Sequence, residues 1–225
     1  GEVQFFNDSS WVTQTLGLPG VRLQMKKAGA RKNLHFKPQE VAATIVTCGG
    51  LCPGLNSVIR ELVMMLYAYG VKKVYGIKGG YKGVVNPQTW VTLTPDNVKD
   101  IHLQGGSILV ADRGNPPHIE MAKVLKKKGI RQHFVLGGDG TQKGAYQTYE
   151  QMVNIGWECA VVGIPKTIDN DINLLDRSFG FDTAMAEAQK AIDVAYTEAT
   201  CNAHCIGLVK LMGRHCGYLT MMSLL

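Results

Sequence analysis

Short apolar runs rich in β-branched residues alternate with longer segments of helical periodicity through most of this chain. The first run, residues 41–46, leads into a glycine turn, and apolar residues at helical spacing follow over 58–69. Strands joined by crossover helices imply a Rossmann-like α/β fold, a mostly parallel sheet with helices on both faces. Further strands are expected at 74–77, 107–110, 133–136 and 160–164, and further helices at 119–128, 144–155 and 182–200.

One glycine-rich turn follows the expected strand at 133–136. Residues 137–141 read GGDGT and precede a segment that can be helical. Glycines there would let backbone N–H groups approach phosphate oxygens, and Asp139 could meet a metal ion. The same letters also mark diacylglycerol and NAD kinases, and such a turn is often only a strand-to-helix connection. The motif alone therefore favours a phosphate-binding turn and a purely structural connection about equally.

A second segment, residues 165–171, reads PKTIDND and is more specific. On an extended segment, Asp169 and Asp171 point to one face, where one carboxylate could accept a hydroxyl proton and the other could interact with Mg²⁺. Solvated or capping carboxylates are the ordinary alternative for such a pair. The adjacent Lys166 and Thr167 leave few such alternatives. Together, the two segments predict a phosphoryl-transfer site.

Composition narrows the class of protein. The chain has 225 residues, is 45% hydrophobic and has no apolar run long enough to span a bilayer. We interpret it as a globular intracellular chain without membrane partners. The six cysteines lack the density of a disulfide scaffold. Cys201, His204 and Cys205 invite a zinc interpretation, but packing is favoured, and we predict no structural metal.

The formal charge of +6 raises the question of nucleic acid. The basic residues are dispersed, and the run at 126–128 is explained by a solvated helix end. Arg113, Lys166, Lys210 and Arg214 fall instead within motifs suited to phosphorylated anions. We therefore expect no nucleic-acid partner.

The order of the motifs resembles the phosphofructokinase family. GGLCPGLN at 49–56, GGSILVADRG at 105–114, FGFDTA at 179–184 and KLMGRHCG at 210–217 accompany the two segments above. TCGGLCPGLN, PKTIDND and VKLMGR are most similar to the plant and trypanosomatid ATP-dependent branch. Residues 1–40, mixed in character and without a catalytic signature, are expected to form an N-terminal extension. The resemblance implies that residues 41–225 form a nucleotide-binding α/β domain with the start of the sugar-phosphate-binding part.

The resemblance also implies roles for residues. Asp169 would be the general base for the C1 hydroxyl of fructose 6-phosphate, with Thr167 orienting the sugar and Asp171 in the metal or transition-state shell. Asp139 would bind Mg²⁺, and Arg113 would neutralise charge on the transferring phosphoryl. The other implied contacts are Gly50, Gly114, Gly138, Gly140 and Thr141 to the nucleotide, and Met212, Gly213 and Arg214 to the sugar phosphate.

Donor choice is predicted from Gly140 and Lys166. In the resembled pyrophosphate-dependent enzymes an Asp replaces Gly140, and its bulk and charge would block an α-phosphate. The glycine therefore favours ATP. Lys166 is shared with the pyrophosphate branch, and the plant-like ATP branch combines this glycine with this lysine. The expected function is ATP-dependent 6-phosphofructokinase in glycolysis, with the pyrophosphate-dependent enzyme as the alternative.

Some residues depart from the resembled pattern. Val110, Ala111 and Asp112 stand where family members commonly have small residues, and a carboxylate facing a triphosphate would repel it. Cys205 stands where bacterial enzymes bring a substrate-binding arginine across a subunit interface. The family's second half is also missing, so we expect a fragment that ends within a helix near Leu225.

A noncatalytic regulatory or assembly subunit is therefore a further alternative. Asp139, Asp169, Asp171 and Arg214 argue against it, because a protein that only binds has no chemical need for a base. We expect a homo- or hetero-oligomer in the cytoplasm, with a plastid or another organelle left open.

Overall fold

The computed structural model describes residues 11–15, 22–26, 29–172, 175–213 and 217–225. The chain divides into two units, Gly1–Lys37 and Pro38–Leu225. In the first unit, strands β1 (Trp11–Thr15) and β2 (Arg22–Lys26) form an antiparallel pair. The expected role of residues 1–40 as an extension stays a prediction.

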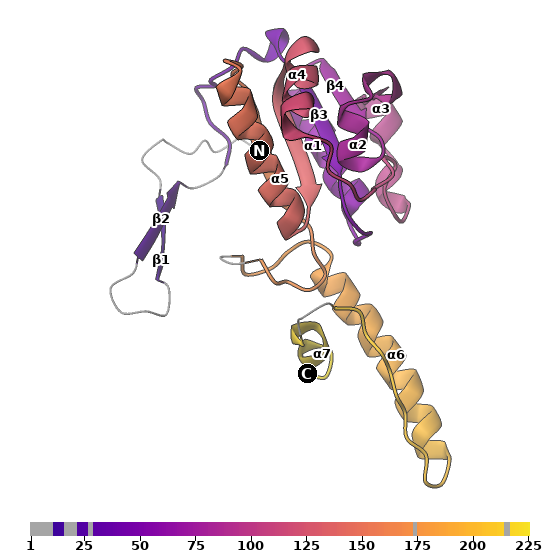
Figure 1. The fold of residues 1–225 in the computed structure, drawn as a ribbon. Coiled ribbons are helices and arrows are strands. Elements are labelled where there is room, and N and C mark those ends of the chain that lie inside the picture. Colours follow the sequence, from indigo (N-terminus) through magenta and orange to yellow (C-terminus); the bar gives the residue numbers. More distant parts are fainter. Residues whose placement is uncertain (1–10, 16–21, 27–28, 173–174, 214–216) are drawn as a thin grey trace. The chain divides into compact units, whose positions relative to one another are not determined.

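The second unit is built on a five-stranded sheet of order β5-β4-β3-β6-β7 (Figure 1). The central strand β3 (Ala42–Thr47) is parallel to β4 (Lys73–Ile77) and to β6 (Ile130–Gly137). β7 (Ala160–Pro165) is parallel to β6, and the short edge strand β5 (Val91–Thr92) is antiparallel to β4. The predicted α/β class with a mostly parallel sheet is confirmed.

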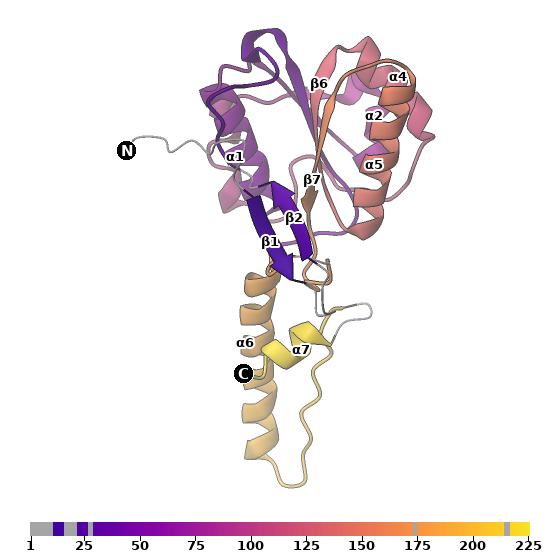
Figure 2. The ribbon, with the colours of Figure 1, turned by 90° about the vertical axis from the view of Figure 1, so that its left-hand side faces the viewer.

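Helices cover both faces of this sheet. Figure 2 shows α1 (Leu55–Ala68) on one side of the strands and α2 (Gly80–Val84), α4 (His118–Lys127) and α5 (Asp139–Asn154) on the other. The four-residue helix α3 (Pro95–Val98) packs beside α1. Single 3₁₀ turns lie at Pro38–Glu40, Pro87–Thr89 and Ile101–Leu103.

The core lies between the sheet and these helices. Every residue of β3 is buried, as expected for a central parallel strand covered on both faces. Tyr81, Met121, Leu125 and Met152 pack on one side of it and bring α2, α4 and α5 into one cluster. The apolar stripes of the helices therefore position the turns at the ends of the strands.

The expected strand at 107–110 is wrong. Val110 has a φ of 53°, a left-handed conformation that a strand excludes. The backbone N–H of Ile108 donates to Asn56 Oδ1 at 2.9 Å, and that of Leu109 donates to Ser107 Oγ at 3.2 Å. Because side chains accept these bonds, the segment forms a turn, and only an isolated bridge between Cys48 and Asp112 follows it.

The second unit ends in α6 (Phe181–Cys201) and α7 (Tyr218–Met222). Phe181 is buried and stacks on Tyr218, with ring centroids 5.4 Å apart. Residues 205–210 are irregular, and Ile206 within them is exposed. No helix in the described part of the chain combines the length and apolar character needed to cross a bilayer.

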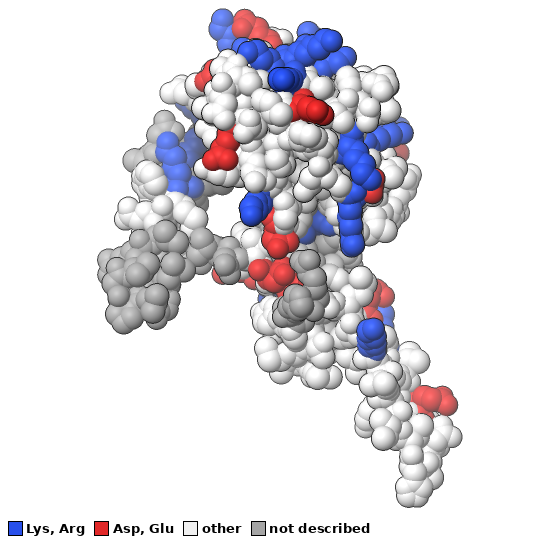
Figure 3. All heavy atoms as spheres, in the orientation of Figure 1, with Lys and Arg blue, Asp and Glu red and all other residues white. Residues whose placement is uncertain are grey.

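Charged side chains are interspersed on the visible face. In Figure 3, lysines and arginines stand among carboxylates and gather most densely at the upper end of the view. That end lies opposite the arrowheads of the parallel strands in Figure 1.

Candidate active site

A pocket of about 850 Å³ lies where β3, β6 and β7 end. Parallel sheets collect ligands at this edge, because the turns after the strands converge there. Its lining comes from the turn after β3, α2, the loop before α4, the start of α5, the loop after β7 and the segment before α7. The pocket is lined by Cys48, Gly49, Gly50, Leu51, Cys52, Tyr81, Asp112, Arg113, Gly114, Asn115, Gly138, Asp139, Gly140, Thr141, Lys166, Thr167, Ile168, Asp169, Asp171, Lys210, Leu211, Met212 and Gly213.

The glycine turn after β3 lies between two cations. A Cβ added to Gly49 would lie 3.4 Å from Lys166 Nζ, and one added to Gly50 would lie 4.0 Å from Arg113 Nη2. Gly49 also has a φ of 82°, which side-chain-bearing residues rarely adopt. Bare backbone beside an ammonium and a guanidinium suits phosphate oxygens, which need close donors and positive charge.

Lys166 is a buried cation. Its ammonium donates to the backbone oxygen of Gly50, and its side chain is largely shielded from solvent. Burial lowers the pKa of Lys166, and Arg113 acts in the same direction, while the thiols of Cys52 and Cys48 oppose them. An anion entering the pocket would favour the charged form of this lysine. This electrostatic position makes Lys166 a candidate phosphate ligand.

The neighbouring thiols are not candidate nucleophiles. Burial raises the pKa of Cys48 to about 12 and that of Cys52 to about 11. Both thiols therefore remain protonated near neutral pH. Since the thiolate is the reactive form, these residues serve packing at the base of the pocket.

The start of α5 forms another wall. Gly138 is the N-cap and Asp139 the first residue of this sixteen-residue helix, so the N–H groups of the first turn and the positive end of the helix dipole lie in this region. A Cβ on Gly140 would meet nothing within 4 Å, whereas one on Gly137 would lie 2.4 Å from the Thr141 side chain. Gly137 is thus required by packing, and Gly140 leaves open space.

The loop after β7 carries the predicted carboxylates. Asp169 and Asp171 both line the pocket, as does Thr167, whose Oγ1 accepts the Asp169 N–H at 3.0 Å. Between the carboxylates, Asn170 has a φ of 51°, a conformation that asparagine tolerates better than most residues. Its side chain bonds the backbone of Asp176 at 2.9 Å and of Ser178 at 2.7 Å. Asn170 therefore anchors the loop.

Sequence reasoning assigned no role to Asn170. The available signal was its position inside a loop, where the asparagine side chain commonly bonds nearby backbone. Tyr81 and Lys82 were also missed, because their partners, Thr141 and Asp112, lie 60 and 30 residues away along the chain.

The last wall is the segment before α7. Met212 and Gly213 line the pocket, and Met212 is 75% exposed. The predicted sugar-phosphate ligand Arg214 lies outside the described residues. All the other predicted site residues line this pocket, whereas their individual roles stay predictions.

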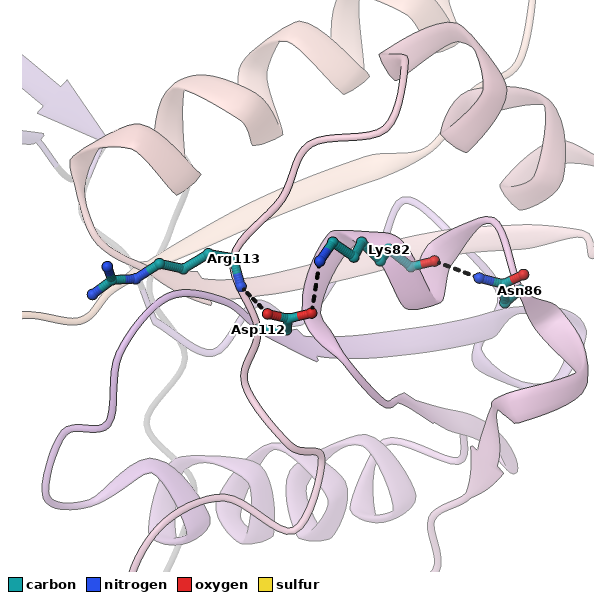
Figure 4. Close-up of polar contacts among 4 residues, drawn as sticks. All are labelled: Lys82, Asn86, Asp112 and Arg113. Carbon is teal, nitrogen blue, oxygen red and sulfur yellow. Dashed lines mark hydrogen bonds and ion pairs between the residues drawn. The ribbon is translucent and has the colours of Figure 1, made fainter.

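Asp112 also lines the pocket, and its carboxylate is paired. It accepts Lys82 Nζ at 3.0 Å and the backbone N–H of Arg113 at 2.6 Å (Figure 4). The hydrogen bond from Lys82 and then that from Arg113 lower the pKa of Asp112, so the group is ionised. The Arg113 guanidinium points away from this pair. The Lys82 ammonium therefore partly compensates the repulsion expected between the Asp112 carboxylate and a triphosphate.

The carboxylates fit a magnesium–nucleotide complex better than a protein metal cage. No group of three His, Cys, Asp or Glu residues that could hold a metal occurs among the described residues. Mg²⁺ usually takes one or two carboxylates together with substrate phosphates and water. Asp139 at the pocket wall, beside the open space at Gly140, fits that donor set.

The fold and pocket define an α/β protein with a glycine-lined, cationic pocket at the carboxyl edge of a parallel sheet, the edge where such folds commonly bind phosphorylated ligands. The family model described as Phosphofructokinase matches residues 42–225. The chain belongs to the phosphofructokinase family.

Curated relatives agree with this membership. The chain is 50% identical over 204 residues to "ATP-dependent 6-phosphofructokinase 7" of Arabidopsis thaliana, covering 90% of this chain and 42% of that one. It is 44% identical over 195 residues to "ATP-dependent 6-phosphofructokinase" of Trypanosoma brucei brucei, covering 85% and 40%. The predicted likeness to plant and trypanosomatid members is confirmed. The chain spans about 40% of the length of these relatives.

Solved structures share the fold. Phosphofructokinase from Pichia pastoris in the T-state superimposes with a TM-score of 0.67 at 24% identity, covering 86% of this chain and 23% of that one. A pyrophosphate-dependent phosphofructokinase from Marinobacter aquaeolei gives a TM-score of 0.71 at 20% identity, covering 81% and 48%.

Proposed function

We propose that the complete protein is an ATP-dependent 6-phosphofructokinase, which transfers the γ-phosphoryl group of ATP to the C1 hydroxyl of fructose 6-phosphate. The observation that carries the proposal is a single pocket shared by the start of α5, two cations and two carboxylates. Arg113 and Lys166 lie beside the Gly49–Gly50 turn, and Asp169 and Asp171 line the same pocket. Fructose 1,6-bisphosphate and ADP would be the products of this glycolytic step.

In this proposal Asp169 is the general base. As the C1 oxygen forms its bond to the γ-phosphorus, the hydroxyl proton passes to the Asp169 carboxylate, and the bond from phosphorus to the ADP oxygen breaks. Thr167, Met212, Gly213 and Arg214 would orient the sugar phosphate. Asp171 would contribute to the metal or transition-state shell, and Arg113 would stabilise charge on the transferring group.

Bound Mg²⁺ would neutralise charge on the β- and γ-phosphate oxygens. Asp139 is its proposed protein ligand, because it lines the phosphate pocket at the start of α5. Gly50, Gly114, Gly138, Gly140 and Thr141 would approach the nucleotide phosphates closely. The four glycines have no side chain and that of Thr141 is small, so backbone groups stay accessible.

The free space at Gly140 supports ATP as the donor. A Cβ there would meet nothing within 4 Å, so the position can admit an additional phosphate. The Arabidopsis and trypanosome relatives at 44–50% identity carry ATP in their names. Pyrophosphate is the alternative, since Lys166 suits either donor.

The test is a pair of kcat/KM values for the native complete protein, measured with ATP and with pyrophosphate at the same saturating fructose 6-phosphate. We expect a clear preference for ATP. A preference for pyrophosphate would overturn the donor assignment. Absence of turnover with both donors would favour the noncatalytic regulatory or assembly role.

We further propose that the complete protein is a homo- or hetero-oligomer in the cytoplasm. A plastid is the alternative, because some relatives of comparable identity are named chloroplastic. Fractionation of the source cells, followed by sizing of the native protein, would test both statements.

A further inference from the structure

The loop that presents Arg113 is attached to α2 through charged side chains. Lys82 on α2 donates to Asp112 Oδ2 at 3.0 Å, and Asp112 Oδ1 accepts the Arg113 backbone N–H at 2.6 Å (Figure 4). The Lys82 backbone oxygen in turn accepts Asn86 Nδ2 at 2.9 Å. One carboxylate therefore joins the helix to the backbone from which Arg113 projects.

Close backbone packing reinforces this attachment. A Cβ on Gly114 would lie 2.4 Å from Lys82 Cε, so the lysine stem lies directly against the backbone of that glycine. A Cβ on Gly80 would lie 2.7 Å from the Asp112 backbone oxygen, which also accepts the Gly49 N–H at 3.1 Å. Asp112 thus contacts both α2 and the glycine turn after β3.

The Arg113 guanidinium points away from Lys82 and Asp112 (Figure 4). Its Nη2 lies 4.0 Å from a Cβ built on Gly50, at the pocket wall. The Asp112 carboxylate pairs with the Lys82 ammonium and with the Arg113 backbone N–H. The charge of the Arg113 guanidinium is thus directed to the pocket wall, where an anion would bind. Without Lys82, an uncompensated carboxylate would line a pocket that must accept phosphates.

We propose that Lys82 is a positioning residue of the phosphate pocket, which holds and neutralises Asp112 and so orients the loop that carries Arg113. This inference rests on the proposed binding of a nucleotide in that pocket. It assigns Lys82 no contact with the substrate; the residue acts through Asp112.

The competing explanation is an ordinary surface ion pair. The side chains of Lys82 and Asp112 are 58% and 48% exposed, and pairs of this kind contribute little to folding stability. The two explanations differ in what a substitution should change. An ordinary surface pair predicts that each substitution changes ATP affinity only slightly and independently of the other. A positioning role predicts that removing the Asp112 charge restores the ATP affinity that is lost with Lys82.

The experiment compares the unmutated native protein with Lys82→Met, Asp112→Asn, the double variant and Lys82→Arg. Asparagine retains an acceptor for the Arg113 N–H but removes the charge. ATP affinity is measured by calorimetry in the absence of sugar, and kcat and KM for ATP are measured separately. Lys123→Met, an exposed change in α4, is the matched control for loss of a lysine.

We expect Lys82→Met to weaken ATP binding about tenfold, with a larger effect on KM than on kcat. The double variant should recover to within about threefold of the unmutated protein, and Lys82→Arg should retain its affinity. Unaltered ATP binding in Lys82→Met would overturn the proposal. A loss that Asp112→Asn does not relieve would also overturn it, because Lys82 would then act on the phosphate itself.

The calorimetric comparison separates this inference from the proposed function. If the unmutated protein binds ATP but does not phosphorylate fructose 6-phosphate, the proposed function is wrong. The ATP affinities of the Lys82 and Asp112 variants still test the positioning role of Lys82. If the unmutated protein phosphorylates fructose 6-phosphate but the variants do not show the expected loss and recovery of ATP affinity, only the inference about Lys82 is wrong.

Discussion

The Tyr81 hydroxyl donates a hydrogen bond to the backbone oxygen of Thr141 at 2.7 Å. This bond joins α2 to the first turn of α5, the turn that lines the candidate active site. The Tyr81 side chain is buried, and a Cβ on Gly144 would lie 2.9 Å from its ring. A glycine within α5 therefore lets the ring pack against the helix, which positions the hydroxyl beneath the turn.

Replacing Tyr81 with phenylalanine should loosen the first turn of α5 while keeping the ring. Loss of this single hydrogen bond should lower the free energy of unfolding by about 1 kcal/mol. The KM for ATP should rise several-fold, because the N–H groups that we propose to bind phosphate belong to that turn. Denaturant unfolding and steady-state kinetics measure the two effects. Tyr149→Phe, on an exposed position of α5, is the control and should change neither.

Replacing Asp169 with asparagine should remove the proton acceptor. We expect kcat to fall on the order of 10²–10⁴-fold, while the dissociation constant for ATP stays nearly constant. Asp176→Asn, an exposed change in the same loop, is the matched control. Turnover close to normal in Asp169→Asn would remove this residue from the mechanism.

Replacing Asp139 with alanine should weaken productive binding of the magnesium–nucleotide complex. The free Mg²⁺ concentration that gives half-maximal activity should rise by about tenfold, because one carboxylate ligand is lost. Asp96→Ala removes a comparable first-turn carboxylate from α3, outside the pocket, and serves as control. If the magnesium dependence is the same for both variants, Asp139 is not the metal ligand.

Replacing Gly140 with aspartate should damage ATP use far more than pyrophosphate use. Because an added Cβ meets nothing within 4 Å, the folded protein can accept the side chain, and the change acts on the ligand. Bulk and negative charge would then oppose an α-phosphate. Gly140→Ala separates these causes, since it adds only a methyl group. Equal losses with both donors would show that Gly140 does not select between them.

The buried His133 should make stability depend on pH. Its Nδ1 lies 2.8 Å from Thr44 Oγ1, and burial lowers its pKa to about 4 from an unfolded value near 6.5. The unfolded state therefore binds more protons between these values, so stability is complete above about pH 6.5 and is lost as pH falls towards 4. The loss can reach about 3 kcal/mol.

Urea unfolding from pH 7.5 to 4.5 would measure this dependence. His133→Asn replaces the titrating ring with a neutral side chain and should flatten the pH profile in that window. His102→Asn, which removes an exposed histidine, should leave the slope intact. An identical slope in His133→Asn and the unmutated protein would contradict the assignment.

Local patterns predicted the elements of the sheet well because each pattern is a property of contiguous residues. The run at 74–77 became β4, Lys73–Ile77, since its apolar residues suit a covered strand. The helix expected from 144 begins earlier, at Asp139, because tertiary packing overrides the low helix propensity of Gly140. The run at 107–110 failed because Asn56, about fifty residues earlier, accepts a backbone bond there.

The sequence by itself determined the alternation of strands and helices, and with it the edge of the sheet where the motif turns meet. This follows from periodicity and from the parallel direction of successive strands. Only the tertiary structure decided the partners of individual charges. Asp112 could have faced a phosphate, but folding brings Lys82 within 3.0 Å of it. Such pairing depends on backbone packing between distant segments, which no local pattern encodes.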